Sequence, residues 1–352
     1  MCLFDIMNIT IKKGHDIQIT GVPSGEIKPL PDPPTLAILP VEFRGVKPKL
    51  LVKEGDAVHI GSPLFFDKTK PEIKFASPGG GTIKVIQFGP RRVLEKIEID
   101  LDRNEEHNSI SFPFEKKIET LNREKVLETI LSANLFHLIR QRPFNKVGDP
   151  KDEPRDIFIS AINSAPLTVD LELILKDSLT QFQSGITVLS KLTEGNVYLG
   201  LRPDSSLNEI KHAECVTVNG PHPAGNIGIQ IHHTSPIKPG EVIWTVNAQD
   251  VVVLGNLFLT GKYDPTRVVT MGGLGGKDPV HVRTRAGISM ASLLHDQLVN
   301  EPSRIISGDV LTGKEIYKTG FLGFYETTVS VLPDTVNREF LGMLRPGNKY
   351  SR

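Results

Sequence analysis

The chain has 352 residues, 39% of them hydrophobic and 23% charged. This length exceeds what one hydrophobic core usually organises and predicts two or three domains. Lys plus Arg equals Asp plus Glu at 41 each, so a general electrostatic attraction to nucleic acid is excluded and no nucleic-acid partner is expected. Two cysteines, Cys2 and Cys215, cannot supply the four thiolates of an iron–sulfur cluster or a closed zinc site.

Residues 1–34 are expected to form N-terminal strands and a Pro-rich link. Apolar residues alternate at Ile9 and Ile11 and again at Ile17 and Ile19, which is the period of a strand. The most apolar stretch, residues 243–259, is interrupted by polar side chains, whereas a membrane helix needs about 20 largely apolar residues. No membrane span is therefore predicted.

The pattern of strands and turn glycines in residues 35–104 predicts a flattened barrel built from two similar halves. Gly55 and Gly61 in the first half and Gly81 in the second permit tight turns between short strands. Apolar and charged residues alternate over residues 97–102, which predicts a strand with one buried face. The pattern resembles the biotinyl/lipoyl hammerhead, whose hairpin tip carries a modified lysine. The corresponding Lys68 and Lys70 lack the flanking residues of true carriers, so a packing module is favoured over a carrier.

Residues 120–255 predict a Rossmann-like α/β domain with a parallel sheet. Asn122 is a predicted helix cap followed by apolar residues at helical spacing, and the run from Pro166 to Leu175 is expected to be the start of a largely apolar helix. The predicted buried strands are residues 156–162, 197–201 and 214–218. Strands alternating with helical runs indicate a parallel sheet with right-handed crossovers.

Residues 256–335 predict a β-grasp, SLBB-like domain, and residues 336–352 are expected to begin a C-terminal region that is truncated. The glycine-rich run from Gly272 to Asp278 lacks the Ser or Thr and the glycine spacing of a phosphate loop. A hairpin turn is therefore favoured there.

Four stretches, taken with this domain order, resemble the NqrA family, one of the subunit families of the sodium-translocating NADH:quinone reductases. NqrA is related to RnfC and to the flavoprotein subunit of complex I. The stretches are ITIKKG (9–14), LLVKEGD (50–56), GPHPAGNIG (220–228) and PIKPGEVIWTVNAQDV (236–251). The resemblance implies a peripheral subunit on the cytoplasmic face of the bacterial inner membrane. Its partners would be the integral membrane subunits of a complex that couples NADH oxidation and ubiquinone reduction to Na⁺ export.

No redox cofactor is expected in this subunit. Flavin-binding relatives have a glycine-rich loop that lets the main chain approach the cofactor phosphate, whereas residues 132–144 contain no glycine and residues 160–166 no carboxylate. The flavins and iron–sulfur of the complex would lie on other subunits, and the isolated chain is not expected to be catalytic. The alternatives are an independent flavin-dependent NADH oxidoreductase and an RnfC-like electron-transfer subunit.

The glycine-free segment mixes aromatic and cationic residues that suit stacking on, and hydrogen bonding to, a quinone headgroup. The candidate quinone-binding residues are Phe136, His137, Arg140, Arg142 and Phe144. The alternative, which is favoured, is an amphipathic helix that fills the vacated flavin cavity.

A second candidate, for a subunit contact or a ligand loop, comprises Gly220, His222 and Gly225 after a predicted strand. Its two prolines remove N–H donors, which favours a structural turn. His232 and His233 are adjacent and would point to opposite faces of a strand, so no metal site is expected. Trp244 is interpreted as a packed strand residue.

Overall fold

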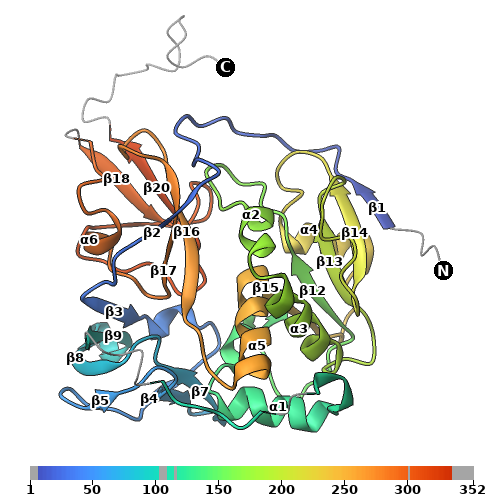
Figure 1. The fold of residues 1–352 in the computed structure, drawn as a ribbon, viewed down its shortest axis with the longest axis horizontal. Helices are drawn as coiled ribbons and strands as arrows, with labels where there is room; N and C mark the ends of the chain where they lie inside the picture. The colour runs from blue at the N-terminus through green and yellow to red at the C-terminus, as the bar shows by residue number, and fades with distance from the viewer. Residues whose placement is uncertain (1–6, 103–108, 115–116, 300–301, 335–352) are drawn as a thin grey trace, which may run out of the picture.

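The computed structural model describes residues 7–102, 109–114, 117–299 and 302–334. The described residues form three modules built on four sheets (Figure 1). None of the helices in these ranges has the length and apolarity needed to cross a bilayer. The expected C-terminal region, residues 336–352, lies outside the described residues.

The first module is the predicted flattened barrel, made of two small sheets in the orders β3-β9-β8-β5 and β4-β6-β7. Ile97 and Ile99 of β9 are fully buried while Asp100 is exposed, so the apolar face of this strand is the buried one, as predicted. The strands are β3 (Thr35–Ile38), β4 (Pro48–Leu50), β5 (Ala57–Val58), β6 (Pro63–Asp67), β7 (Lys70–Ala76), β8 (Gly81–Phe88) and β9 (Leu94–Leu101), with short turns η1 (Pro40–Glu42) and η2 (Pro90–Arg92).

The hairpin tip between β6 and β7 is fixed by its own side chains. Asp67 is 2% exposed and accepts hydrogen bonds from the backbone N–H groups of Lys47 and Thr69. Lys70 forms an ion pair with Asp149 of the second module, with Nζ 3.0 Å from Oδ2. The tip is thus held against the neighbouring module, which agrees with a barrel that serves as a packing module.

The second module is a seven-stranded sheet in the order β1-β14-β13-β12-β15-β10-β11. The strands from β1 to β15 in this order are parallel, and β10 and β11 are antiparallel additions. The strands are β1 (Met7–Thr10), β10 (Arg140–Arg142), β11 (Lys146–Val147), β12 (Asp156–Ser160), β13 (Val197–Leu201), β14 (Glu214–Asn219) and β15 (Ile243–Asn247). The Rossmann-like parallel sheet predicted from the strand and helix alternation is therefore present.

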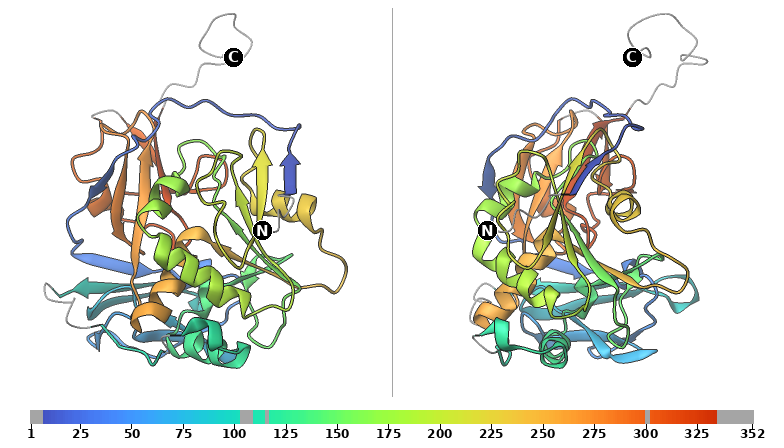
Figure 2. Two further views of the ribbon diagram at one scale, coloured as in Figure 1. Left: turned by 45° about the vertical axis from the view of Figure 1, so that its right-hand side comes forward. Right: turned by 90° about the vertical axis from the view of Figure 1, so that its right-hand side faces the viewer.

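The helices of this module cover both faces of the sheet, with α4 on the face opposite α3 and α5 (Figure 2). They are α1 (Arg123–Ser132), α2 (Leu171–Lys176), α3 (Leu179–Ser190), α4 (Ile227–Thr234) and α5 (Ala248–Thr260), with turns η4 (Ile118–Thr120) and η5 (Phe136–Leu138). A Cβ on Gly255 would lie 1.8 Å from the carbonyl oxygen of Gln181. Glycine there lets α5 pack directly on the backbone of α3.

The third module is a six-stranded sheet in the order β19-β18-β20-β16-β17-β2. Its elements are β2 (Ile27–Pro29), β16 (Thr266–Gly272), β17 (Val280–Arg285), α6 (Met290–Leu293), β18 (Ser303–Ser307), β19 (Lys314–Ile316) and β20 (Thr328–Pro333). The glycine-rich run joins the antiparallel strands β16 and β17, so it is a hairpin connection as predicted.

The N-terminal segment joins the second and third modules. Ile9 of β1 pairs in parallel with Val218 of β14, and Lys28 of β2 pairs in parallel with Val282 of β17. In Figure 1 this dark blue segment crosses the top of the molecule from one sheet to the other. The expectation of a second strand at Ile17 and Ile19 was wrong, because no strand lies between β1 and β2 among these described residues.

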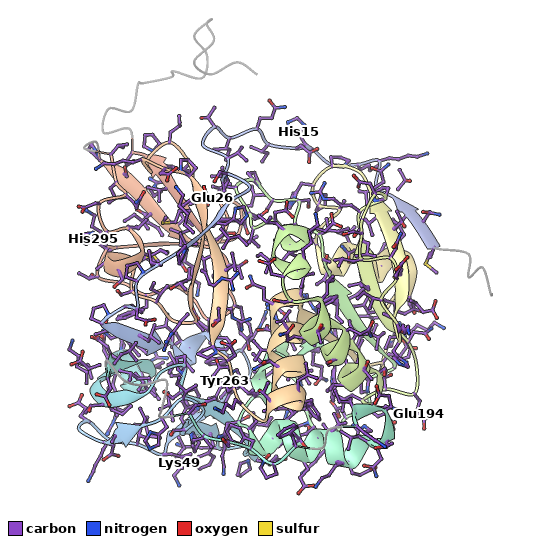
Figure 3. The ribbon with its side chains drawn as sticks, in the orientation of Figure 1. His15, Glu26, Lys49, Glu194, Tyr263 and His295 are labelled. Atoms are coloured by element: carbon purple, nitrogen blue, oxygen red, sulfur yellow. The ribbon has the colours of Figure 1, made fainter. Side chains whose placement is uncertain are left out.

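One apolar core runs through all three modules. It contains Phe75 of the barrel, Ile157 of the parallel sheet and Phe324 from the third module. Figure 3 marks the buried Tyr263 where the modules meet, with Lys49 and His295 at the periphery. The helix α5 runs through residue 255, the predicted end of the α/β domain, and ends at Thr260.

Two further local predictions of secondary structure were wrong. The helix expected from Pro166 begins only at Leu171, where the side chain of Asp170 caps it by accepting hydrogen bonds from Glu172 and Leu173. The helix expected in the glycine-free segment is instead the turn η5 followed by the strand β10. That turn is nevertheless buried, since every residue from 133 to 139 is inaccessible to solvent or nearly so.

Candidate functional site

A cavity of about 590 Å³ lies where the strand order of the parallel sheet reverses. From β12 the chain proceeds to β13 and β14 on one side and then returns to β15 on the other. Ser160 and Asn247 end β12 and β15, and both line the cavity. Open α/β sheets commonly bind ligands at such a switch point. Residues 324–328 of the third module form the opposite wall.

Arg140 enters this cavity from β10 and is held by two neutral groups. Its Nη2 donates to Oδ1 of Asn247 at 3.0 Å, and its guanidinium lies 4.6 Å from the ring centroid of Tyr325. Tyr325 in turn donates its hydroxyl hydrogen to the carbonyl oxygen of His137 at 2.7 Å. The third module thus fixes the position of an arginine in the second.

Arg142 lies on the same face of β10, because side chains two residues apart in a strand point the same way. Burial and the neighbouring charge of Arg140 lower its pKa to about 10. It therefore remains protonated at neutral pH. The Nε atoms of both arginines are buried without a hydrogen-bond acceptor among the described residues.

Carboxylates from α5 and from the third module also line the cavity. Asp250 forms a buried ion pair with Arg267, which offsets its charge. Burial raises the pKa of Glu326 to about 7, and the nearby charges of Glu42 and Asp309 contribute to this rise. The third-module wall therefore changes charge near neutral pH.

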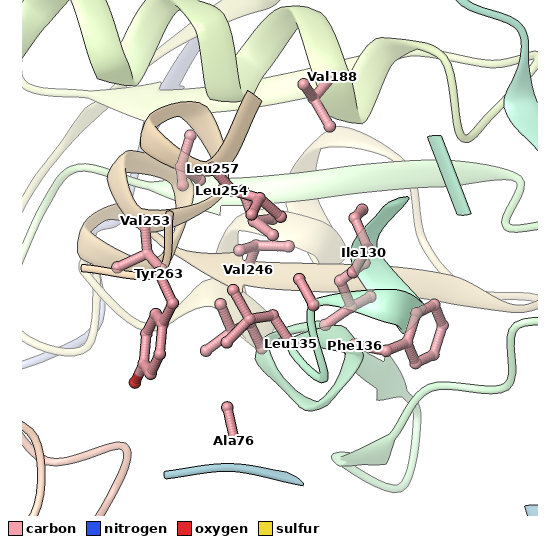
Figure 4. Packing of buried hydrophobic residues seen from close by; sticks show 14 of the residues in the cluster. Ala76, Ile130, Leu135, Phe136, Val188, Val246, Val253, Leu254, Leu257 and Tyr263 are labelled. Carbon is pink, nitrogen blue, oxygen red and sulfur yellow. The ribbon is translucent and has the colours of Figure 1, made fainter. Parts of the chain in front are cut away.

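The five candidate quinone-binding residues do not share one surface. Phe136 and His137 are fully buried, and Phe136 packs edge-on against Trp244 with ring centroids 5.7 Å apart. Figure 4 shows Phe136 among the apolar residues of the core. Phe144 is 67% exposed, and only Arg140 and Arg142 line the cavity.

His137 is part of an aromatic cluster and contributes no accessible donor. Its ring stacks on Phe75 at 4.9 Å between centroids and lies 5.0 Å from Phe324. Burial, together with the charge of Arg267, lowers its pKa to about 3. Backbone groups lie near its two ring nitrogens, but neither nitrogen has a hydrogen bond of good geometry. His137 is thus an uncharged core residue at neutral pH.

The second candidate loop anchors the N-terminal segment. The backbone N–H of His222 donates to Oδ1 of Asp16 at 2.8 Å, and its Nδ1 lies 3.0 Å from Oγ of Ser164. A Cβ on Gly220, where φ is +123°, would lie 2.2 Å from the carbonyl oxygen of Ile11. The loop is therefore a close-packed turn, although Gly220 lines a second cavity of about 690 Å³ and Gly225 the first.

The two adjacent histidines lie in α4 and not in a strand, which corrects the expected secondary structure. The rings of His232 and His233 are 5.1 Å apart between centroids. Within the described residues, no group of three or more His, Cys, Asp or Glu is arranged to hold a metal ion. Trp244 is a fully buried strand residue, as predicted.

The sequence reasoning missed the residues that position Arg140. Asn247 ends a buried strand just before a helix, and this pattern marks a ligand-side position in a parallel sheet. Tyr325 and Glu326 carry no comparable signal, because they reach the cavity only through packing of the third module on the second.

Three regions of the chain match known protein domains. Residues 9–102 match the NqrA N-terminal barrel-sandwich hybrid domain, residues 121–263 the NqrA second alpha/beta domain, and residues 268–318 the NQRA C-terminal domain. Similar proteins are each named as the same subunit of the Na(+)-translocating NADH-quinone reductase. That of Pasteurella multocida is 37% identical over 347 residues, covering 97% of this chain and 78% of the relative. That of Pseudomonas aeruginosa is 36% identical over 342 residues, covering 96% and 76%.

The fold and the cavity define a three-module α/β protein with a ligand-sized site where its second and third modules meet. The chain belongs to the NqrA family of subunits of the Na(+)-translocating NADH-quinone reductases. An NAD+-reducing [NiFe]-hydrogenase structure covers 51% of this chain and 41% of its own, at 11% identity and a TM-score of 0.36.

Proposed function

We propose that the chain is a peripheral subunit of a sodium-pumping NADH:ubiquinone reductase that contributes assembly and no redox cofactor of its own. It would lie on the cytoplasmic face of the bacterial inner membrane, against integral subunits that hold the flavins and iron–sulfur. Its relatives are named as subunits of such a reductase. NADH, ubiquinone and Na⁺ would be substrates of the whole complex.

The observation that carries the proposal is the burial of the glycine-free segment. Where flavin-binding relatives expose main-chain N–H groups to a phosphate, residues 133–139 are packed into the core. Phe136 and Leu138 are both 0% exposed. A cofactor phosphate at this place would require the core to open, which supports a structural role for the segment.

A pull-down from detergent-solubilised membranes tests the assembly role. The tagged chain is expected to recover integral subunits of the reductase in stoichiometric amounts. A matched sample with the tag on an unrelated cytoplasmic protein is the control. Recovery of the tagged chain alone, from membranes that hold the other subunits, would contradict the proposal.

A contribution to quinone access is a second candidate function. Arg140 and Arg142 both face the cavity and both carry a buried Nε without an acceptor among the described residues. Guanidinium donors hydrogen-bond well to carbonyl oxygens such as those of a quinone. Phe136 and His137 would not contact a quinone in this cavity, because both are fully buried and neither lines it.

A further inference from the structure

Two arginines on one strand face line the cavity at the sheet switch point, and neither forms an ion pair with a carboxylate among the described residues; Glu326 interacts with Arg140 only through its charge at longer range. Among the described residues, the partners of Arg140 are an amide oxygen and an aromatic ring. Neither of these carries a charge. Arg142 has no acceptor for its buried Nε within the same part of the chain. Two like charges on one strand face repel each other, and an anion between them would offset that repulsion.

Two helices begin at the same end of the cavity. Residues 226–228 and 247–250, which include the first turns of α4 and α5, line it. The N-cap residues Asn226 and Asn247 have extended backbones, and neither side chain caps its helix. The side chain of Asn247 instead accepts a hydrogen bond from Arg140. A cation therefore sits where the helix dipole favours an anion.

The other charged groups around the cavity indicate where the anionic group of a ligand would bind. Asp250 is paired with Arg267, so it adds no free negative charge at the α5 end. Asp309 and Glu326 line the cavity from the third module. Asp309 accepts hydrogen bonds within its own turn, from Leu311 and Thr312. An anion is therefore favoured beside Arg142 and the first turns of α4 and α5 and disfavoured beside Asp309 and Glu326 of the third module.

The cavity has room for a ligand of nucleotide size. Its volume of about 590 Å³ falls within the range of roughly 300–1,000 Å³ that is usual for small-molecule sites. Gly228 in the first turn of α4 lines it, and a Cβ added there would meet no atom within 4 Å. The approach to the α4 N-terminus is thus open.

We propose that this cavity binds a small phosphorylated organic molecule, with its phosphate between Arg140, Arg142 and the first turns of α4 and α5. A phosphate presents three oxygens to these converging donors, whereas a carboxylate presents two and a neutral carbonyl offsets no charge. Both arginines belong to the glycine-free segment, but they lie on β10, after the part of that segment, residues 133–139, that is buried in the core. The proposal goes beyond the assembly role and does not rest on it.

Isothermal titration calorimetry of the full chain tests the proposal with AMP, inorganic phosphate and adenosine as probes. AMP is expected to bind, inorganic phosphate to bind more weakly and to compete with AMP, and adenosine not to bind. Raising the salt concentration should weaken AMP binding, since both arginines remain partly accessible to solvent. Arg142→Gln is expected to weaken AMP binding by about tenfold or more, the usual effect of losing a charged hydrogen bond.

Gly228→Glu provides a variant that leaves the core untouched. It places a carboxylate in open space beside the cavity and is expected to abolish AMP binding while the chain stays folded. Arg91→Gln, on the exposed hairpin between β8 and β9, and Gly25→Glu, in the open link before β2, match the two changes in charge. Both controls should bind AMP as the unmodified chain does.

Weakened AMP binding in Arg142→Gln and abolished binding in Gly228→Glu, with binding kept in both controls, would establish the site. No binding of AMP or phosphate to the unmodified chain would overturn it. AMP binding that survives Gly228→Glu would also overturn it. Binding of a soluble ubiquinone analogue at Arg142 would likewise overturn the proposal if phosphate did not displace the analogue.

Discussion

The hydroxyl of Tyr325 donates to the carbonyl oxygen of His137 at 2.7 Å, and this bond joins the third module to the glycine-free segment of the second. The same tyrosine ring lies under the guanidinium of Arg140. Packing between modules therefore sets both the buried turn η5 and the arginine beside it.

Phe136→Ala is expected to destabilise the isolated chain strongly. Phe136 is fully buried against Trp244, and removing a buried phenylalanine costs about 3–5 kcal/mol. Phe144→Ala is the matched control, because Phe144 is 67% exposed and exposed changes stay within about 0.5 kcal/mol. Urea unfolding followed by circular dichroism measures both. Equal, small effects of the two changes would show that Phe136 is not a core residue.

Arg140→Ala in the assembled reductase is expected to raise the apparent KM for ubiquinone about tenfold if the cavity admits a quinone, because a charged hydrogen bond is lost. NADH oxidation with an artificial acceptor should be unchanged, since that chemistry would lie on another chain. Both rates are measured at several quinone concentrations, with Arg91→Ala as the control. Unchanged quinone kinetics in a fully assembled complex would remove Arg140 from the quinone path.

Stability should depend on pH through Glu326. Its pKa is about 7 in the folded chain against an ordinary value of 4.5, so between these values the folded state binds the proton more tightly than the unfolded state. The stability from this group is therefore present below about pH 4.5 and lost as pH rises through 7, by at most about 3 kcal/mol.

Glu326→Gln should remove this pH dependence. The free energy of unfolding of the variant, relative to that of the unmodified chain, should therefore rise between pH 5 and pH 8. The midpoint of urea unfolding at several pH values measures the difference, with the exposed Glu194→Gln as control. An identical pH dependence in Glu326→Gln and the unmodified chain would refute the assignment.

Lys68 and Lys70 should carry no biotinyl or lipoyl group in cells. Lys70 is engaged with Asp149, and buried Asp67 fixes the hairpin tip, so the lysines are not presented as a free carrier arm. Intact-mass measurement of the chain from its native host tests this. A mass increment matching either group, mapped to one of these lysines, would restore the carrier interpretation.

Local patterns predicted much of the fold, because they report burial along one strand or helix. The strand around Ile97 and the buried strand at Ile157 follow from alternation and from a continuous apolar run. The pairing of β1 with β14 joins Met7 to Val216, residues far apart in the chain. No local pattern specifies such a partner.

The candidate site was predicted only in part for the same reason. Arg140 and Arg142 were identified from their residue type and position, and both line the cavity. The sequence left open whether Phe136 faces a ligand or the core, because the local pattern of aromatic and cationic residues is the same in both cases; the structure buries it. Its burial is decided by Trp244, which lies on a different strand.

We predict that this chain holds no redox cofactor of its own. The most direct measurement is the visible absorbance spectrum and iron content of the chain purified from a host that makes the whole reductase. The protein is expected to be colourless and to contain no stoichiometric iron, because two cysteines cannot ligate a cluster and the buried turn η5 presents no phosphate cradle. A flavin band or iron in stoichiometric amount would contradict it.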